Sequence, residues 1–256
     1  MKIGIMDSGL GGLTVLKECL QRLPAHDYVY YADSLNAPYG KKTPEEVLRL
    51  TANVVEKLVE LGAEMIVLAC NTATSAAAEV LRAQYDIPII GMEPAIKPAL
   101  AAAGIKRVLV TATELTLKQP KFRNLIDTLD ASLRVDYLPL TQLVNFAETG
   151  DFSRETVMPY LQEKFANICP AEYGSIVLGC THFPLFRAYF AELFSETTTI
   201  LDGTVGTTKR IQEFITYDTP TPRITFYTSG KLVTAGLQFE LMQRIIMAEN
   251  VEMDGA

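Results

Sequence analysis

The amino-acid sequence predicts an α/β fold made of two similar α/β domains with mainly parallel sheets. Short apolar runs that read as buried strands alternate with helical patterns along the chain. One short stretch occurs twice, as MIVLACNT at 65–72 and as SIVLGCTH at 175–182. Each copy is a strand that runs into a small residue, a cysteine and polar residues able to start a helix. The offset of 110 residues between the copies (175 minus 65) indicates two related halves.

The first half begins with a strand, a glycine turn and a helix. The apolar residues 2–6 end at the turn Asp7-Ser8-Gly9-Leu10-Gly11-Gly12, and an apolar helical pattern follows over 13–20. Glycines let the backbone turn tightly and bring N–H groups at a helix start close to an anionic ligand. The turn lacks the full G-x-G-x-x-G fingerprint of dinucleotide-binding proteins. It therefore predicts the first unit of an α/β sheet, with a possible anion site at its end.

A second strand and a capped helix follow. Residues 28–32 read as the strand, and Thr43-Pro44-Glu45-Glu46 has the Thr cap, the proline and the glutamate that open a helix. The adjacent glutamates are therefore a helix start rather than a catalytic pair. The rest of the half is expected to contain the first cysteine strand, a helix near 72–82, a strand at 87–90 and a helix at about 94–103.

The second half is expected to repeat this alternation. Strands are predicted at 106–111, 133–138, 175–178 and 198–201, with helices near 140–148, 153–168, after Pro184 and at 204–214. A strand of edge type at 224–228 and a helix at about 231–248 come last. Because these two elements follow the second copy, we expect the C-terminal part to return to the first half. The predicted domains are 1–93 plus 208–256, and 94–207, with a cleft between them.

The composition is that of a soluble globular protein. Of 256 residues 48% are apolar and 21% are charged, and the net charge is −7. There is no cluster of Lys and Arg, which argues against a nucleic-acid partner, and no apolar run of the length that spans a membrane. The chain begins directly with a strand, so the cytoplasm is the expected location. There the four cysteines are expected to stay reduced.

Polar side chains gather where the predicted strands end, and two of them are cysteines. In an open α/β sheet ligands bind beyond these ends. Cys70 and Cys180 occur in matching contexts, and a thiol can act as a base if its thiolate is stabilised or its proton passes to a partner. His182 could serve Cys180 in this way and Asp7 could serve Cys70. Cys19 and Cys169 are expected in the core, and His26 in a solvated loop.

Four motifs in this order resemble the glutamate racemases of the cofactor-independent aspartate/glutamate racemase superfamily. They are Asp7 to Gly12, Pro38-Tyr39-Gly40, Ala69-Cys70-Asn71-Thr72-Ala73 and Gly179-Cys180-Thr181-His182-Phe183-Pro184. The resemblance implies two α/β domains about a pseudo-twofold axis, with the active site in their cleft. It also implies racemisation without a cofactor or a metal, and a supply of D-glutamate for bacterial peptidoglycan.

The same resemblance implies a role for each site residue. Cys70, assisted by Asp7, would deprotonate D-glutamate, and Cys180, assisted by His182 and Glu148, would deprotonate L-glutamate. The substrate, a small molecule, would be held by Asp7, Ser8, Tyr39, Gly40, Asn71, Thr72, Thr181 and His182, with Asp33 at the rim of the site.

The chain departs from the family pattern at three places. Leu35-Asn36 stands where an Ala-Arg pair is usual, Gln119 and Phe122 replace a Ser and a Tyr, and Gly203 follows Asp202 in place of a Ser. All three lie outside the catalytic motifs. The doubt they raise therefore concerns the rim of the cleft, an interface or regulation rather than the chemistry.

Other functions stay open at this point. Cys180, His182 and an acid could form the nucleophilic site of a hydrolase, which would leave Cys70 without a role. Cys70, Cys180 and His182 could hold zinc. The chain could also be a racemase for aspartate or another amino acid, a decarboxylase or an anion-binding module. The sequence does not fix the oligomeric state, and a homodimer is one assembly it permits.

Overall fold

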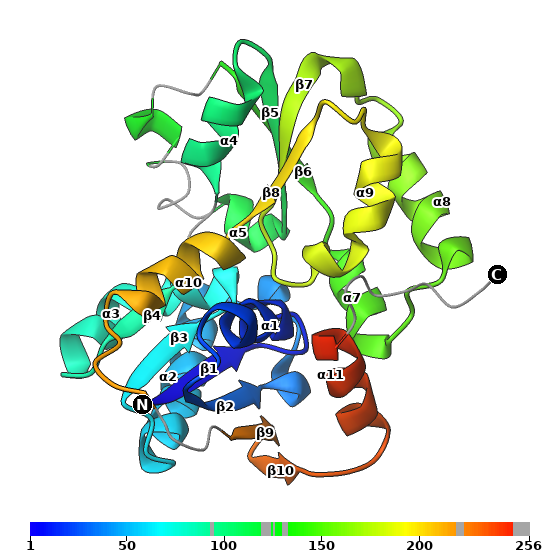
Figure 1. The fold of residues 1–256 in the computed structure, drawn as a ribbon. Coiled ribbons are helices and arrows are strands. Elements are labelled where there is room, and N and C mark those ends of the chain that lie inside the picture. Colours follow the sequence, from blue (N-terminus) through cyan, green and yellow to red (C-terminus); the bar gives the residue numbers. More distant parts are fainter. Residues whose placement is uncertain (93–94, 119–123, 125, 130–132, 219–222, 248–256) are drawn as a thin grey trace.

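The computed structural model describes residues 1–92, 95–118, 124, 126–129, 133–218 and 223–247, which form two sheets covered by helices (Figure 1). The first sheet has the strand order β10-β9-β2-β1-β3-β4 and the second has the order β6-β5-β7-β8. All neighbouring strands are parallel except β9 and β10. The strands are β1 (Lys2–Asp7), β2 (Asp27–Ala32), β3 (Met65–Leu68), β4 (Ile89–Gly91), β5 (Arg107–Ala112), β6 (Val135–Pro139), β7 (Tyr173–Leu178), β8 (Thr199–Asp202), β9 (Ile224–Thr228) and β10 (Lys231–Val233).

The two sheets repeat one arrangement. In chain order the first four strands lie as second, first, third and fourth in the first sheet, and β5 to β8 lie in the same order in the second sheet. The third strand of each set, β3 or β7, leads directly into a cysteine. The predicted α/β class, with mainly parallel sheets in two related units, is therefore confirmed.

Helices bury both faces of each sheet. On the first sheet, α1 (Leu13–Arg22), α10 (Thr204–Gln212) and α11 (Leu237–Met247) pack on one face, and α2 (Pro44–Glu60) and α3 (Asn71–Gln84) on the other. On the second sheet, α4 (Ile96–Ala103) covers one face and α7 (Gln142–Thr149), α8 (Arg154–Phe165) and α9 (Arg187–Leu193) cover the other. A short helix, α5 (Glu114–Lys118), follows β5. Burial of apolar side chains on both faces is what holds strands of this kind in parallel sheets.

The start of α2 shows how closely local signals match the structure. Thr43 accepts a hydrogen bond from the Glu46 backbone N–H, and the Glu46 side chain accepts one from the Thr43 N–H. Pro44 is the first helical residue. The predicted capping box is therefore present.

Two expectations for the C-terminal part are wrong. β9 is not an edge strand, because it pairs with β2 on one side and with β10 on the other. Residues 231–233 form β10 instead of beginning the last helix, which starts at Leu237. β9 nevertheless returns to the first sheet as expected. Of the two predicted domain boundaries, 93/94 lies outside the described residues and 207/208 falls inside α10.

Two side chains also lie in surroundings that differ from those expected. His26 is buried, with Nε2 3.9 Å from a carboxylate oxygen of Asp218. Cys169 is exposed, beyond the end of α8 at Phe165, because Pro170 disfavours a helical conformation for the residue before it.

Candidate active site

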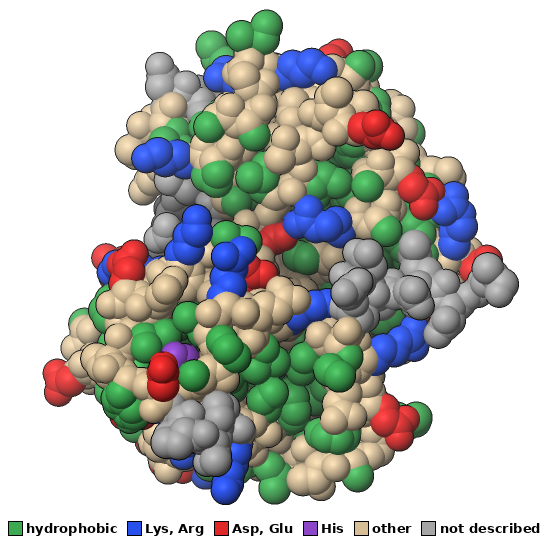
Figure 2. All heavy atoms as spheres, in the orientation of Figure 1, with side chains coloured by type: hydrophobic (Ala, Val, Ile, Leu, Met, Phe, Trp, Pro, Cys, Tyr) green, Lys and Arg blue, Asp and Glu red, His purple; other side chains and the backbone are tan. Residues whose placement is uncertain are grey.

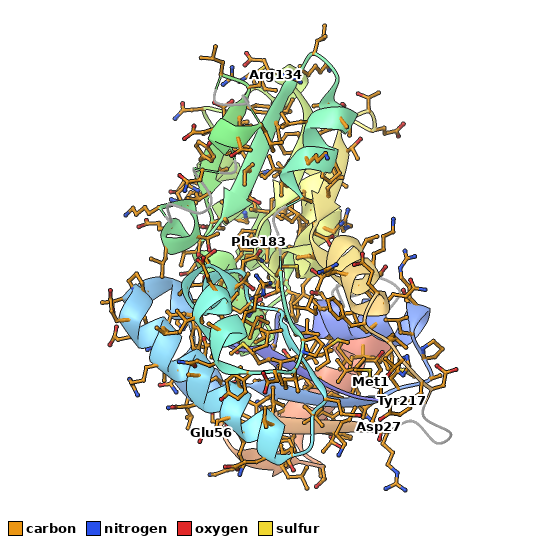
Figure 3. The ribbon with its side chains drawn as sticks, turned by 90° about the vertical axis from the view of Figure 1, so that its left-hand side faces the viewer. Met1, Asp27, Glu56, Arg134, Phe183 and Tyr217 are labelled. Atoms are coloured by element: carbon orange, nitrogen blue, oxygen red, sulfur yellow. The ribbon has the colours of Figure 1, made fainter. Side chains whose placement is uncertain are left out.

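The catalytic candidates lie at the carboxyl ends of strands from both sheets. Asp7 ends β1, Cys70 follows β3 and Cys180 follows β7. Phe183, close behind Cys180, lies at the junction between the upper and lower parts of the molecule, whereas Met1, Asp27 and Tyr217 lie far from it (Figure 3). The site is thus built where the carboxyl edges of the two sheets meet.

Cys180 begins a chain of contacts that ends in the other half of the protein. Its Sγ lies 3.6 Å from Nδ1 of His182, and Nε2 of His182 lies 2.6 Å from Oε1 of Glu148. The same Glu148 oxygen accepts a hydrogen bond of 2.6 Å from the backbone N–H of Leu10. Glu148, which follows no recognisable local motif, is held in place by the turn after β1.

His182 carries a proton in this arrangement. Burial lowers its pKa, but the contacts with Cys180 and Glu148 outweigh burial and raise the pKa well above its usual value. The imidazolium donates Nε2–H to Glu148 and directs Nδ1–H at the sulfur, an assignment that follows from the hydrogen-bond partners. The Gly11 N–H lies 3.2 Å from Nε2 and can donate to it only when that nitrogen has lost its proton.

Cys70 has a different environment. It is the N-cap of α3, where its Sγ accepts a 3.5 Å hydrogen bond from Ala73 N–H, and its thiol lies 3.7 Å from the Ser8 hydroxyl. Burial, and then the charges of Asp7 and Cys180, raise the pKa of Cys70 to about 12. In the closed site Cys70 is therefore a thiol that holds its proton.

Asp7 connects the surroundings of the two cysteines. Its carboxylate accepts 2.8 Å from the backbone N–H of Gly9 and 2.9 Å from the hydroxyl of Thr181, the neighbour of Cys180. Burial raises the pKa of Asp7 to about 6, although His182 acts in the opposite direction. A carboxyl group with such a pKa can exchange protons near neutral pH.

The glycines of the turn after β1 make the close approach of the halves possible. A Cβ atom at Gly9 would overlap the carboxylate of Glu148, and one at Gly11 would lie 2.5 Å from Nδ1 of His182. The N–H groups of this turn thus hold side chains of the protein itself, at Asp7 and Glu148.

The comparisons with known proteins agree with this geometry. The sequence profile of the Asp/Glu/Hydantoin racemase family matches residues 3–210. This chain belongs to that family. It is 46% identical over 237 residues to the glutamate racemase of Halothermothrix orenii, covering 90% of this chain and 94% of the relative. It is also 46% identical over 236 residues to glutamate racemase 2 of Bacillus subtilis, covering 90% and 89%.

Solved structures extend the comparison to the fold. The crystal structure of Escherichia coli glutamate racemase, in complex with L-glutamate and the activator UDP-MurNAc-ala, superposes with a TM-score of 0.82 at 26% identity. The match covers 95% of this chain and 94% of that one. The resemblance stated from the motifs is therefore confirmed, and so is the enzyme class, an amino-acid racemase and hence an isomerase.

The remaining residues expected to bind substrate line the same junction of this racemase. Ser8, Asn71, Thr72 and Thr181 are buried, and Thr72 Oγ1 lies 3.2 Å from Oγ1 of Thr116 in the other half. Tyr39 donates its hydroxyl to Asp33 over 2.7 Å, and a Cβ atom at Gly40 would lie 2.9 Å from Cβ of Thr113. Thr72, Thr181 and Gly40 thus lie against the opposite half.

Two supporting side chains escape sequence reasoning. The Thr14 hydroxyl, in the first turn of α1, lies 2.8 Å from the Gly11 carbonyl and 3.2 Å from the Thr181 carbonyl. The Tyr30 hydroxyl donates to the Gly9 carbonyl over 2.6 Å. Both residues read as ordinary helix and strand positions, and no local signal marks them.

Among the described residues there is neither a metal cluster nor a spanning helix. Within the part of the chain that the structure describes, no group of three or more His, Cys, Asp and Glu side chains is arranged to hold a metal. No helix among the described residues is long and apolar enough to cross a bilayer.

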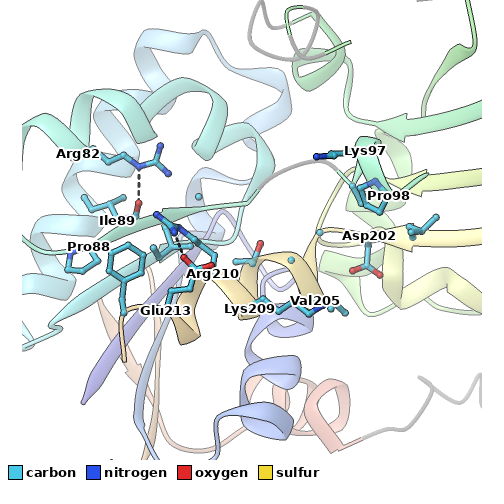
Figure 4. A pocket seen from close by; sticks show the side chains of 18 of the residues that line it. Arg82, Pro88, Ile89, Lys97, Pro98, Asp202, Val205, Lys209, Arg210 and Glu213 are labelled. Carbon is cyan, nitrogen blue, oxygen red and sulfur yellow. Dashed lines mark hydrogen bonds and ion pairs between the residues drawn. The ribbon is translucent and has the colours of Figure 1, made fainter. Parts of the chain in front are cut away.

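A cavity of about 1450 Å³ lies apart from the cysteines (Figure 4). Residues 82–91, 95–98 and 199–214 supply most of its lining, and none of the catalytic candidates is among the lining residues. Within it Arg82 donates to the Ile89 carbonyl and Arg210 pairs with Glu213. On the face shown in Figure 2, basic and acidic side chains are interspersed, which accords with the absence of a basic cluster in the sequence.

Proposed function

We propose that this racemase interconverts L-glutamate and D-glutamate by moving the Cα proton between two cysteines, without a cofactor or a metal. The observation that carries the proposal is the placement of Cys70 and Cys180. They follow equivalent strands of the two sheets, and the hydrogen bond between Asp7 and Thr181 connects their loops. Racemisation by two bases needs one group on each side of the substrate.

The protonation states of the closed site favour one direction of the first turnover. The charge of protonated His182, whose Nδ1 lies 3.6 Å from Sγ of Cys180, would favour removal of the proton by Cys180, whereas Cys70 retains its proton. The Cys180 thiolate then takes the Cα proton of L-glutamate. Cys70 gives its proton to the opposite face, which leaves D-glutamate, a thiol at Cys180 and a thiolate at Cys70. Reaction of D-glutamate in the reverse sense, or proton exchange through Asp7 and His182, restores the starting state.

Fixed hydrogen-bond donors, together with protonated His182, would stabilise the carbanion between these two transfers. Hydrogen-bond donors fixed in a site that excludes water are more effective than the same groups in solution. The proposed substrate ligands are buried for the most part and include no Lys or Arg: Asp7, Ser8, Tyr39, Gly40, Asn71, Thr72, Thr181 and His182.

Glutamate is the substrate favoured by the relatives. Two curated relatives at 46% identity are glutamate racemases, and the E. coli structure that superposes on this chain holds L-glutamate. A racemase for aspartate is the alternative. Assaying both amino acids decides between them.

The contacts of Cys180 with His182 and of His182 with Glu148 also resemble the nucleophile, base and acid of a hydrolase, the alternative left open by the sequence, but membership of the racemase family argues against it. Cys70 distinguishes the two functions. Replacing Cys70 with Ser should abolish racemisation, whereas a hydrolase that uses Cys180 would keep its activity.

Substrate entry requires the halves to separate, because the side chains of Cys70 and Cys180 are almost entirely shielded from solvent. We propose that the moving units are 1–93 plus 208–256, and 94–207. We further propose that the reaction takes place in the cytoplasm and supplies D-glutamate for peptidoglycan.

The deciding experiment follows each glutamate enantiomer in D2O by circular dichroism and proton NMR. Loss of optical activity, with deuterium entering at Cα, is the expected result for protein treated with a chelator and free of pyridoxal phosphate. Cys70→Ser and Cys180→Ser should each reduce racemisation severely. Full activity in both variants would refute the two-cysteine mechanism.

A further inference from the structure

A buried tyrosine reaches the turn after β1 from the neighbouring strand. Tyr30 lies on β2, its side chain is fully buried, and its hydroxyl donates to the Gly9 carbonyl over 2.6 Å. The ring packs edge to face on Phe226 of β9, with the ring centroids 6.3 Å apart. A Cβ atom at Gly12 would lie 3.1 Å from the Tyr30 hydroxyl, so the glycine leaves room for it. The surroundings of Tyr30 therefore hold its hydroxyl at the Gly9 carbonyl.

The direction of this hydrogen bond follows from its partners. A carbonyl oxygen can only accept, so the phenol of Tyr30 donates. Burial and nearby negative charges, among them Asp7 and Glu148, raise the pKa of Tyr30 well above its usual value. The phenol therefore keeps its proton near neutral pH and remains a donor to the Gly9 carbonyl.

The accepting carbonyl belongs to the peptide unit that holds Glu148. The carbonyl of Gly9 and the N–H of Leu10 lie on opposite sides of one planar trans peptide unit, so fixing either group fixes the other. The Leu10 N–H donates to Oε1 of Glu148 over 2.6 Å, and the same oxygen lies 2.6 Å from Nε2 of His182. Nδ1 of His182 lies 3.6 Å from Sγ of Cys180. A continuous series of contacts thus leads from β2 in the first half to a cysteine of the second.

The Tyr30 hydroxyl restrains a peptide unit that has unusual freedom. Because Gly9 has no side chain, its backbone has access to conformations that other residues avoid. Rotation of the peptide unit would move the Leu10 N–H away from Glu148. A hydrogen bond to the carbonyl also polarises the peptide unit, which strengthens the hydrogen bond that its N–H donates. Tyr30 can thus act on Glu148 without touching it.

We propose that Tyr30 is a positioning residue for proton transfer at Cys180, and that it acts through this peptide unit on Glu148 and His182. The inference rests on the proposed function and adds a residue of the first half that controls the acid–base group of the second. Its hydroxyl carries no reacting proton in this role. It keeps the support of the imidazolium in place while the Cα proton moves.

The test compares Tyr30→Phe with Tyr28→Phe as its matched control. Tyr28 lies on the same strand, packs in the same hydrophobic cluster and is also fully buried. Its hydroxyl donates to a backbone carbonyl as well, that of Leu23, over 2.7 Å. Each substitution therefore removes one phenol hydroxyl and the hydrogen bond that it donates to the backbone. Thermal unfolding should show similar losses of stability, whereas only Tyr30→Phe should affect the site.

The first measurement is the titration of His182 by 15N NMR in the protein without substrate. The chain has only two histidines, so the two titrations can be told apart. In Tyr30→Phe the pKa of His182 should fall relative to the unmodified protein, because a displaced Glu148 stabilises the imidazolium less. Racemisation should fall about tenfold in kcat/KM, the effect of losing one hydrogen bond in the transition state. In Tyr28→Phe the titration should be unchanged and kcat/KM should stay within about twofold.

A double variant tests the route through Glu148. Adding Tyr30→Phe to Glu148→Gln should lower kcat/KM by less than about twofold beyond Glu148→Gln alone, because the two changes interrupt one series of contacts. A full tenfold further loss would show a route that bypasses Glu148 and would overturn the inference.

The titration separates a positioning role from a structural one. An unchanged His182 titration in Tyr30→Phe, or an unchanged kcat/KM, would overturn the inference and leave Tyr30 as a core residue. Unmodified protein that does not racemise glutamate would refute the proposed function instead. The His182 titration needs no substrate, so it would still decide whether Tyr30 positions this side chain.

Discussion

Gly9→Ala should inactivate the enzyme by displacing Glu148 rather than by altering a catalytic group. The added Cβ would overlap the Glu148 carboxylate, which now accepts from Leu10 N–H and from His182. Hydrogen bonds to a charged group contribute about 1.5–3 kcal/mol each. Loss of one of them in the transition state lowers kcat/KM roughly 10- to 150-fold.

The same substitution should slow both directions equally. Enantiomers have equal free energies in water, so kcat/KM for L- and D-glutamate must remain equal in every active variant. The kinetic isotope effects of deuterium at Cα, in contrast, can differ between the two enantiomers. Because Glu148 supports Cys180 through His182, proton transfer at Cys180 becomes limiting. In Gly9→Ala, deuterium at Cα should then slow the racemisation of L-glutamate more than that of D-glutamate.

The control is Gly206→Ala, since a Cβ at Gly206 meets no atom within 4 Å. This variant should keep full activity, and alanine inside α10 is expected to stabilise it slightly. Thermal unfolding separates a folding defect from a catalytic one in Gly9→Ala, because each 1 kcal/mol of destabilisation lowers Tm by about 2–4 °C. Activity within about twofold of the parent would refute the account of the glycine turn.

Three further outcomes are expected. Burial raises the pKa of Asp7 from 3.8 to about 6. The protonated carboxyl group stabilises the folded state relative to the carboxylate, and this contribution is fully present below about pH 4 and is lost as the pH rises through 6. Denaturant titrations should therefore show that the free energy of unfolding of Asp7→Asn, measured relative to the parent, increases by roughly 3 kcal/mol between pH 4 and pH 7. A difference that does not change with pH would contradict the assignment. Thr14→Val should lower kcat/KM about fivefold by freeing the Thr181 carbonyl, with recovery in Thr14→Ser. Glu148→Gln should lower the His182 pKa seen by 15N NMR, and an unchanged titration would rule out the ion pair.

Local signals predicted the elements, because each element carries its own pattern. The buried strands before Cys70 and Cys180 and the capping box of α2 are of this kind. The hairpin of β9 and β10 also had a signal. Ser229-Gly230 adopts positive φ at both residues, as tight hairpin turns require, but its position before a helical pattern concealed it.

Contacts across the chain could not be predicted from local patterns. Glu148 meets Leu10 across 138 positions of sequence, and only the family resemblance pointed to it. His26 follows a proline in what reads as a polar connection, and its burial depends on elements distant in sequence. Burial of such a group is a property of the assembled fold, so the pattern around it gave no indication.

The hydrogen bonds that cross between the two halves have a consequence for fidelity. Leu10 from the first half holds Glu148, the support of Cys180, and Thr181 from the second half holds Asp7, the neighbour of Cys70. Neither half contains a complete acid–base set. In the proposed two-cysteine mechanism, separation of the halves would leave the substrate without two competent bases, so the carbanion would form only in the closed site. Under that mechanism, closure of the protein and commitment to proton transfer would be a single event.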